Sequence, residues 1–228
     1  MKIRLAVEDM EPGHWIAWAI DLPACYSSAR TETEAVQQAS MQVAEYFTWL
    51  SQHDPSLPVP SALPEIQIVE TFQSRPARGD PDYLVNAFFA DDRRLLGYWD
   101  IEAALRLLDW TRQDLLAAIQ DVSPEQMTQA IPGETRGSIA GILNHIAGAE
   151  NWYLWQLGLG LETLPDDPAE KLRVVREHTR ALWIELVGDE RVVENSDECW
   201  SARKIVRRTL WHESDHTQHI LKLGRGEK

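Results

Sequence analysis

The stretch His212-Glu213-Ser214-Asp215-His216 decides the fold of this chain, because it carries two imidazoles four positions apart on a segment with helical periodicity. Residues at i and i+4 lie on one face of a helix, about 6 Å apart along its axis, so both rings can reach one metal ion. Read literally, the stretch is also the H-E-x-x-H pattern of zinc proteases, in which the glutamate acts as general base. The first question is therefore which kind of metal site it forms.

A protease site needs a third ligand downstream, and the sequence after the second histidine does not supply one. His219 is too close in sequence, and no glycine-containing H-x-x-G-x-x-H extension follows. The third ligand is therefore expected upstream, where His145 lies in the apolar helical stretch from Ser138 to Glu150. On a helix, His219 falls near the direction of His212, so a pairing of His216 with His219 remains an alternative.

The overall composition indicates a soluble globular protein and disfavours nucleic acid as a partner. With 228 residues, 44% of them hydrophobic, the chain can bury a full core. Its formal net charge of -14 would on average repel a phosphate backbone. The sequence shows no leader and no apolar run of membrane-spanning length, and its two cysteines lack the spacing of a zinc or disulfide motif. We expect a cytoplasmic protein with no nucleic-acid or membrane partner.

The first part of the chain predicts a small β-β-α-β unit. Lys2–Glu8 and His14–Ile20 alternate or run apolar around a proline-glycine turn, which is typical of a β-hairpin. A capping box at Thr31 opens a helix that continues to about Ser51 with apolar residues at helical spacing. After a proline-rich stretch, residues 65–72 predict another strand.

The remaining chain predicts a linker at residues 73–92 and then four amphipathic helices. Their expected ranges are 101–119, 138–157, 167–186 and 202–223. Helices of this kind are not stable alone and bury their apolar faces against one another, which indicates a four-helix bundle. The predicted fold class is therefore α+β, with one domain at residues 1–90, including the linker, and a bundle domain at residues 91–228.

Two family resemblances support this division. In residues 1–72, Asp21-Leu22-Pro23-Ala24-Cys25 and Thr31-Glu32-Thr33-Glu34-Ala35 resemble the turn and helix start of the HicB-like antitoxin fold. The DNA-binding tail of such antitoxins is not present here, and a regulatory, dimerising or packing role is expected for this segment. Residues 91–228 resemble the DinB-like metalloprotein superfamily, through the segment from Ser138 to Tyr153 and the segment from Val206 to His216.

The DinB-like resemblance implies a bundle in which a histidine of the second helix and an H-x-x-x-H pair of the last helix bind a divalent metal. The ligands carried over to this chain are His145, His212 and His216, whereas the superfamily often has glutamine where His219 stands. Three neutral imidazoles favour zinc or nickel and leave a coordination position open, which is typical of a catalytic rather than a structural site.

Two further residues are catalytic candidates because of their place on the last predicted helix. Arg208 lies one turn before His212 on the same face, where it would hold an anionic group of a substrate or cofactor, or else extend along the surface with its charge in water. Glu213 lies off the ligand face and is expected to accept a hydrogen bond behind the ligands, to be solvated, or to act as a base.

The function expected from these features is thiol chemistry at a metal. Characterised branches of the DinB-like superfamily include transferases and isomerases that use bacillithiol, mycothiol or glutathione. The resemblance therefore implies a metal-dependent thiol S-transferase or isomerase, a low-molecular-weight thiol as cosubstrate, a small-molecule electrophile and a homodimer. Two alternatives remain: a metal-hydroxide hydrolase with Glu213 as its base, and a non-catalytic stress or binding protein stabilised by its metal.

Overall fold

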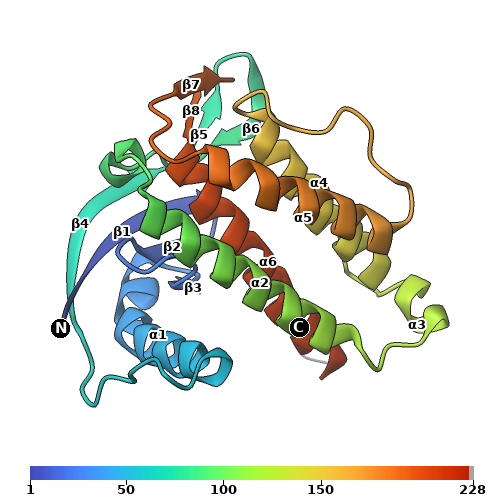
Figure 1. The fold of residues 1–228 in the computed structure, drawn as a ribbon, viewed down its shortest axis with the longest axis horizontal. Coiled ribbons are helices and arrows are strands. Elements are labelled where there is room, and N and C mark those ends of the chain that lie inside the picture. Colours follow the sequence, from blue (N-terminus) through green and yellow to red (C-terminus); the bar gives the residue numbers. More distant parts are fainter. Residues whose placement is uncertain (226–228) are drawn as a thin grey trace. The chain divides into compact units, whose positions relative to one another are not determined.

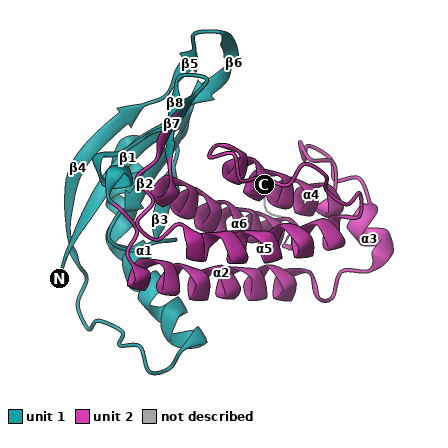
Figure 2. Cartoon of the chain, turned by 45° about the horizontal axis from the view of Figure 1, so that its top comes forward, with its two compact units in different colours: residues 1–94, 194–200 teal, residues 95–193, 201–228 magenta. Residues whose placement is uncertain are grey.

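The computed structural model describes residues 1–225 (Figure 1). They form two compact units, which Figure 2 shows in different colours. Unit 1 comprises residues 1–94 together with 194–200, and unit 2 comprises residues 95–193 and the chain from Ser201 onward. Helices make up 49% of the chain and strands 20%, which confirms the mixed α+β class. The sequence predicted one domain boundary, near residue 90. It gave no indication that residues 194–200 belong with unit 1.

Unit 1 is built on a four-stranded sheet with the order β3-β2-β1-β4. Its elements are β1 (Lys2–Glu11), β2 (His14–Ala19), β3 (Tyr26–Ala29), α1 (Glu32–His53) and β4 (Glu65–Gln73). The first three strands pair antiparallel, whereas β4 runs parallel to β1, so α1 crosses over between the edge strand β3 and β4. The predicted hairpin, helix and last strand are all present; the short strand β3 was not predicted.

One face of this sheet forms an apolar core with α1. Leu5 and Val7 of β1 pack with Ala39 and Val43 of α1, all of them almost inaccessible to solvent. Thr31 caps the helix by accepting a hydrogen bond from the backbone N–H of Glu34, as the capping box predicts. Burial of this regular apolar stripe explains why the helix forms where the spacing of small and branched residues indicated it.

Unit 1 also contains three small elements and most residues of a late hairpin, whose ends belong to unit 2. They are β5 (Arg75–Ala77), β6 (Asp80–Val85) and the 3-10 helix η1 (Ala90–Arg93), followed much later in the chain by the hairpin of β7 (Val192–Asn195) and β8 (Glu198–Ser201). The buried carboxylate of Glu8 accepts hydrogen bonds from Trp18 Nε1 at 3.0 Å and from the backbone N–H of Ala87 at 2.6 Å. The region expected to be a linker is therefore largely structured.

Unit 2 consists mainly of four long helices that pack against one another. They are α2 (Tyr98–Ile119), α4 (Ile139–Trp155), α5 (Pro168–Glu185) and α6 (Ala202–Gly224), with the short helix α3 (Pro124–Thr128) before α4. Helix α4 packs against α5 and α6, and α2 packs against α6 and α5 (Figure 1). The four predicted ranges match these helices to within a few residues, and only the short α3 was not predicted.

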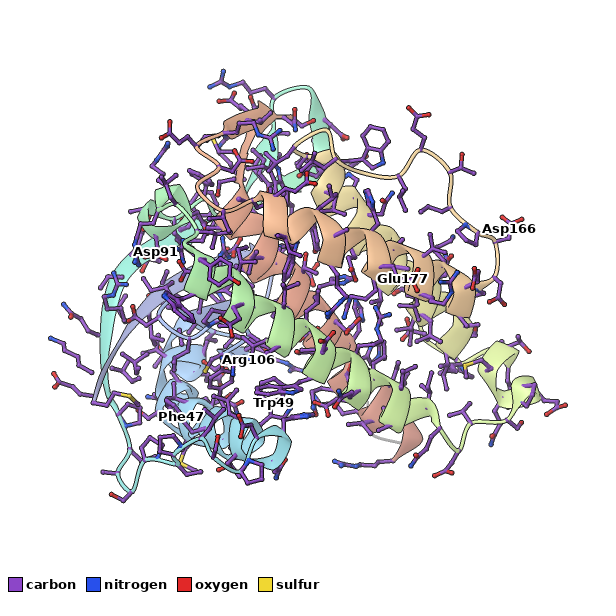
Figure 3. All side chains as sticks on the ribbon, viewed as in Figure 1. Phe47, Trp49, Asp91, Arg106, Asp166 and Glu177 are labelled. Atoms are coloured by element: carbon purple, nitrogen blue, oxygen red, sulfur yellow. The ribbon has the colours of Figure 1, made fainter. Side chains whose placement is uncertain are left out.

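The caps and the apolar stripes of these helices account for their positions. Ser138, Asp167 and Ser201 are the N-caps of α4, α5 and α6, and each side chain accepts a hydrogen bond from a backbone N–H three residues later. The outward face of α5 is charged: Arg173 lies between Glu170 and Glu177, the latter labelled in Figure 3.

None of the helices within residues 1–225 is long and apolar enough to span a membrane.

Candidate metal centre

Helices α4 and α6 bring three histidines together in unit 2. His145 lies on α4 between Ile142 and Ile146, whose buried side chains fix the orientation of the helix. His212 and His216 lie one turn apart on α6, which packs against α4. Although 67 residues separate His145 from His212 in sequence, the helix packing places their rings 4.8 Å apart, centre to centre.

The Nε2 atoms of these rings converge. His212 Nε2 lies 3.1 Å from His145 Nε2 and 3.2 Å from His216 Nε2, and the ligand atoms of all three residues lie within 4.8 Å of one another. With Zn–N distances of 2.0–2.1 Å, two imidazole nitrogens on one ion are separated by about 3.3 Å in a tetrahedron and about 3.0 Å in an octahedron. The residues present thus fit a divalent metal that prefers nitrogen ligands.

The three imidazoles are held in the neutral form that a metal requires. Burial lowers the pKa of His145 to about 4, with a further contribution from the charge of Arg136. Burial and the neighbouring His145 lower the pKa of His216 to about 3. Burial and the other two histidines also lower the pKa of His212 well below its usual value. At pH 7 the cluster therefore presents unprotonated rings, and metal binding does not have to displace a proton from a charged imidazolium.

His219 is directed at a different partner. Its Nε2 lies 3.1 Å from Oε2 of Glu134, in the loop between α3 and α4, and its ring centre lies 6.2 Å from that of His216. Among residues 1–225, the group with metal-ligand geometry comprises His145, His212 and His216. The alternative in which His219 replaces His212 would require the Glu134 contact to be broken.

Glu213 lies off the face of α6 that carries the imidazole cluster, in a buried ionic network. Its carboxylate accepts hydrogen bonds from Thr111 Oγ1 at 3.0 Å, from Arg112 Nη2 at 2.8 Å and from Arg176 Nη2 at 2.7 Å. Burial alone would raise the pKa of Glu213, but Arg176 and Arg112 outweigh this effect and hold it below its usual value. Glu150 also accepts hydrogen bonds from Arg176, at 2.9 Å and 3.0 Å.

This network of two carboxylates and two guanidinium groups joins the four long helices. Burial alone would lower the pKa of Arg176, but the two carboxylates raise it above its usual value, so the group stays charged. The network accounts for Glu213 as an ionised anchor of α6. The sequence placed Glu213 off the ligand face but did not indicate that Arg112 and Arg176 pair with Glu213 and Glu150.

Arg208 is buried on the ligand side of α6 and is surrounded by aromatic rings. Its guanidinium carbon lies 4.7 Å from the centre of the Trp211 ring and 5.8 Å from that of Tyr153. The Tyr153 ring centre is in turn 5.9 Å from that of His212. The charge of Arg208 contributes to the low pKa of His212, after burial and the other histidines. The structure thus brings Arg208 close to the cluster, whereas the carboxylate of Glu213 is engaged by Arg112 and Arg176.

Sequence reasoning missed one cation at the cluster. Nη2 of Arg136, in the loop before α4, lies 3.2 Å from Nε2 of His145. The residue has no periodic or motif signature, because it precedes the helix cap and its side chain reaches the site across the first turns of α4. Its proximity to the predicted start of a helix at residue 138 was the available signal.

A comparison with protein families gives one match. The family model described as Mycothiol-S-transferase matches residues 104–220, which include the three histidines, Arg208 and the ionic network. No curated protein and no solved structure matches the chain.

Proposed function

The chain belongs to the mycothiol-S-transferase family, a DinB-like family, and on that premise we propose that it is a metal-dependent thiol S-transferase with His145, His212 and His216 as the metal ligands. The observation that carries the proposal is the convergence of three Nε2 atoms, at separations of 3.1 Å and 3.2 Å for two of the pairs. The family is metal-dependent, and the cluster is the group in residues 1–225 with suitable geometry.

The ligand set favours zinc or nickel, because imidazole nitrogen suits both ions and no carboxylate among residues 1–225 joins the three histidines. A divalent ion held by three neutral ligands would supply a Lewis acid that lowers the pKa of a thiol at its remaining position. The neutral imidazoles would leave the charge of the ion uncompensated, which favours an anionic ligand such as a thiolate. The thiol sulfur would form the new bond to an electrophilic carbon while the bond from that carbon to its leaving group breaks. The leaving group would depart with the bonding electron pair, and the thiol proton would pass to solvent.

The protein's own residues prepare this site in two ways. Burial keeps the three imidazoles unprotonated, as their low pKa values indicate. The ionic network under α6 fixes the helix that carries two of them, because Glu213 directly follows His212 in sequence. Arg208 is proposed to orient an anionic group of a substrate, since its guanidinium lies on the ligand side of the helix.

The test compares thiol-dependent with water-dependent chemistry. The metal-loaded protein would be incubated with an electrophile and with mycothiol, bacillithiol, glutathione or no thiol, and the products would be separated by mass. A thioether product that requires metal and a thiol supports the transferase, and an isomerised electrophile without net thiol consumption supports the thiol-dependent isomerase. Turnover of the electrophile by water alone would contradict both.

A metal-hydroxide hydrolase would need a base, and Glu213 is the candidate. Its carboxylate accepts hydrogen bonds from two arginines, which makes it a poor proton acceptor. A non-catalytic metal-binding role corresponds to a different outcome of the same experiment: tight metal binding with no product from any thiol. The HicB-like character of residues 1–72, the homodimer and the cytoplasmic location stay predictions.

A further inference from the structure

Arg136 is an exposed cation placed directly at the histidine cluster. Its Nη2 lies 3.2 Å from His145 Nε2, and its charge contributes to the lowered pKa of all three histidines. Within the described part of the chain, its guanidinium has no carboxylate partner. This distinguishes it from Arg112 and Arg176, whose charges are neutralised by Glu213 and Glu150.

The loop that carries Arg136 is held in place by Glu134. The side chain of Glu134 is only 4% exposed, and it pairs with His219 Nε2 through Oε2 at 3.1 Å. Its Oε1 accepts a hydrogen bond from the backbone N–H of Arg136 at 2.8 Å. Glu134 thus joins the loop to α6, and Arg136 starts from a fixed point of the backbone.

A second constraint comes from Gly141 in the first turn of α4. A Cβ atom at this position would lie 1.9 Å from the carbonyl oxygen of Arg136, so the loop backbone packs where any side chain would collide with it. The position of Arg136 therefore depends on the absence of a side chain at residue 141 and on the contact between Glu134 and His219.

His145 Nε2 has two possible uses, as the hydrogen-bond partner of Arg136 and as a metal ligand, and this indicates the role of the Arg136 guanidinium. The Nε2 lone pair of His145 that faces Arg136 is the one that would bind a metal ion, and it cannot serve both. When this lone pair is used for a metal, the guanidinium is released beside the ion with all its N–H donors available. A planar cation with several donors next to a divalent ion is suited to bind an anion.

We propose that Arg136 binds the anionic group of a ligand at the metal centre, either a thiolate sulfur or a carboxylate oxygen. This inference rests on the proposed function, because it assigns a residue to the recognition of the anion in the same site. It predicts opposite effects of losing the guanidinium: metal binding is retained or strengthened, since a competing donor and a positive charge are removed, whereas anion binding is weakened.

The experiment uses the full chain substituted with cobalt. Titration of cobalt against a competing chelator gives the metal affinity, and the visible and near-ultraviolet spectra report binding of 2-mercaptoethanol and of acetate. For Arg136→Gln we expect an unchanged or higher cobalt affinity and about tenfold weaker binding of at least one of the two anions, as for the loss of a charged hydrogen bond. The two probes distinguish a thiolate from a carboxylate as the group that is recognised.

Two variants serve as controls. Arg173→Gln removes the same charge from the exposed face of α5, where Arg173 pairs with Glu170 and Glu177, and should leave both affinities unchanged. Arg136→Lys keeps the charge without the planar fork and should recover part of the anion affinity. If Arg136→Gln binds both anions as tightly as the natural protein, or if it loses cobalt and anions together, the inference is wrong while the transferase proposal stands. If the natural protein binds no cobalt, both are wrong.

Discussion

At the scale of single residues, the buried charges of unit 2 compensate one another beside the histidine cluster of α6. Arg176 is almost completely buried and bridges Glu150 and Glu213, with a further hydrogen bond from its Nη1 to the carbonyl oxygen of Leu108 at 2.5 Å. Each carboxylate is thereby compensated and held away from the imidazoles. A charged network of this kind is a weak source of net stability, but removal of one member is costly.

Replacement of Arg176 by methionine should therefore destabilise the protein strongly. It leaves Glu150 and Glu213 sharing only Arg112, so we expect a loss of about 3–5 kcal/mol in the free energy of unfolding, measured by urea denaturation. The control Arg173→Met removes two exposed ion pairs and should change stability by less than about 1 kcal/mol. Equal effects of the two substitutions would argue against an energetically coupled network.

The low pKa values of the histidines predict that the stability of the metal-free protein depends on pH. Their folded pKa values are lowered, to about 4 for His145 and about 3 for His216, from an ordinary value of 6.5. Below pH 6.5 the unfolded chain binds protons that the folded cluster does not, so the free energy of unfolding should fall as the pH is lowered from about 6.5 toward 4. Denaturation at several pH values, with His145→Gln as a comparison, measures this slope. A slope that is the same in both proteins would contradict the assignment.

At the scale of elements, α4 carries two glycines with opposite roles. Gly141 faces the backbone of Arg136, whereas a Cβ at Gly148 would meet nothing within 4 Å. Both lie inside the same helix, so the intrinsic gain from alanine is similar at the two positions, up to about 1 kcal/mol. The difference in stability between Gly148→Ala and Gly141→Ala therefore measures the cost of placing a Cβ atom against the carbonyl oxygen of Arg136.

Gly148→Ala should thus raise the melting temperature, and Gly141→Ala should lower it. The clash at residue 141 involves a backbone oxygen that cannot rotate away, and a cost of about 1–3 kcal/mol is typical of such overpacking. Thermal denaturation followed by circular dichroism compares the two variants directly. An increase for Gly141→Ala would mean that the loop moves at little cost, and would weaken the fixed position assigned to Arg136.

At the scale of the whole molecule, a metal at the three histidines would connect α4 with α6 and so stabilise the folded chain. A ligand that binds only the folded state adds roughly 2.7 kcal/mol when its free concentration is about 100 times its Kd. We expect zinc or nickel to raise the melting temperature, EDTA to reverse the increase, and elemental analysis to find about one equivalent of metal per chain. His145→Ala should abolish both effects. Full metal occupancy in that variant would exclude His145 as a ligand.

The sequence alone determined the long elements and offered three histidines as candidate metal ligands. Helices α4 and α6 begin within a residue of the predicted positions 138 and 202, because capping and apolar spacing are local properties. The spacing of His212 and His216 follows from the geometry of one helix. Their convergence with His145 was expected from a family resemblance, and the packing of α4 against α6 produces it.

Only the tertiary structure decided what surrounds these histidines. Arg176 meets Glu213 across 37 residues, and Arg112 meets it across 101, through side chains whose positions have no periodic signature. Arg136 reaches His145 because a loop is held by Glu134 and packs against a glycine. Long-range contacts depend on how helices cross and on which loops fit between them, and a local pattern of residues carries no information about either.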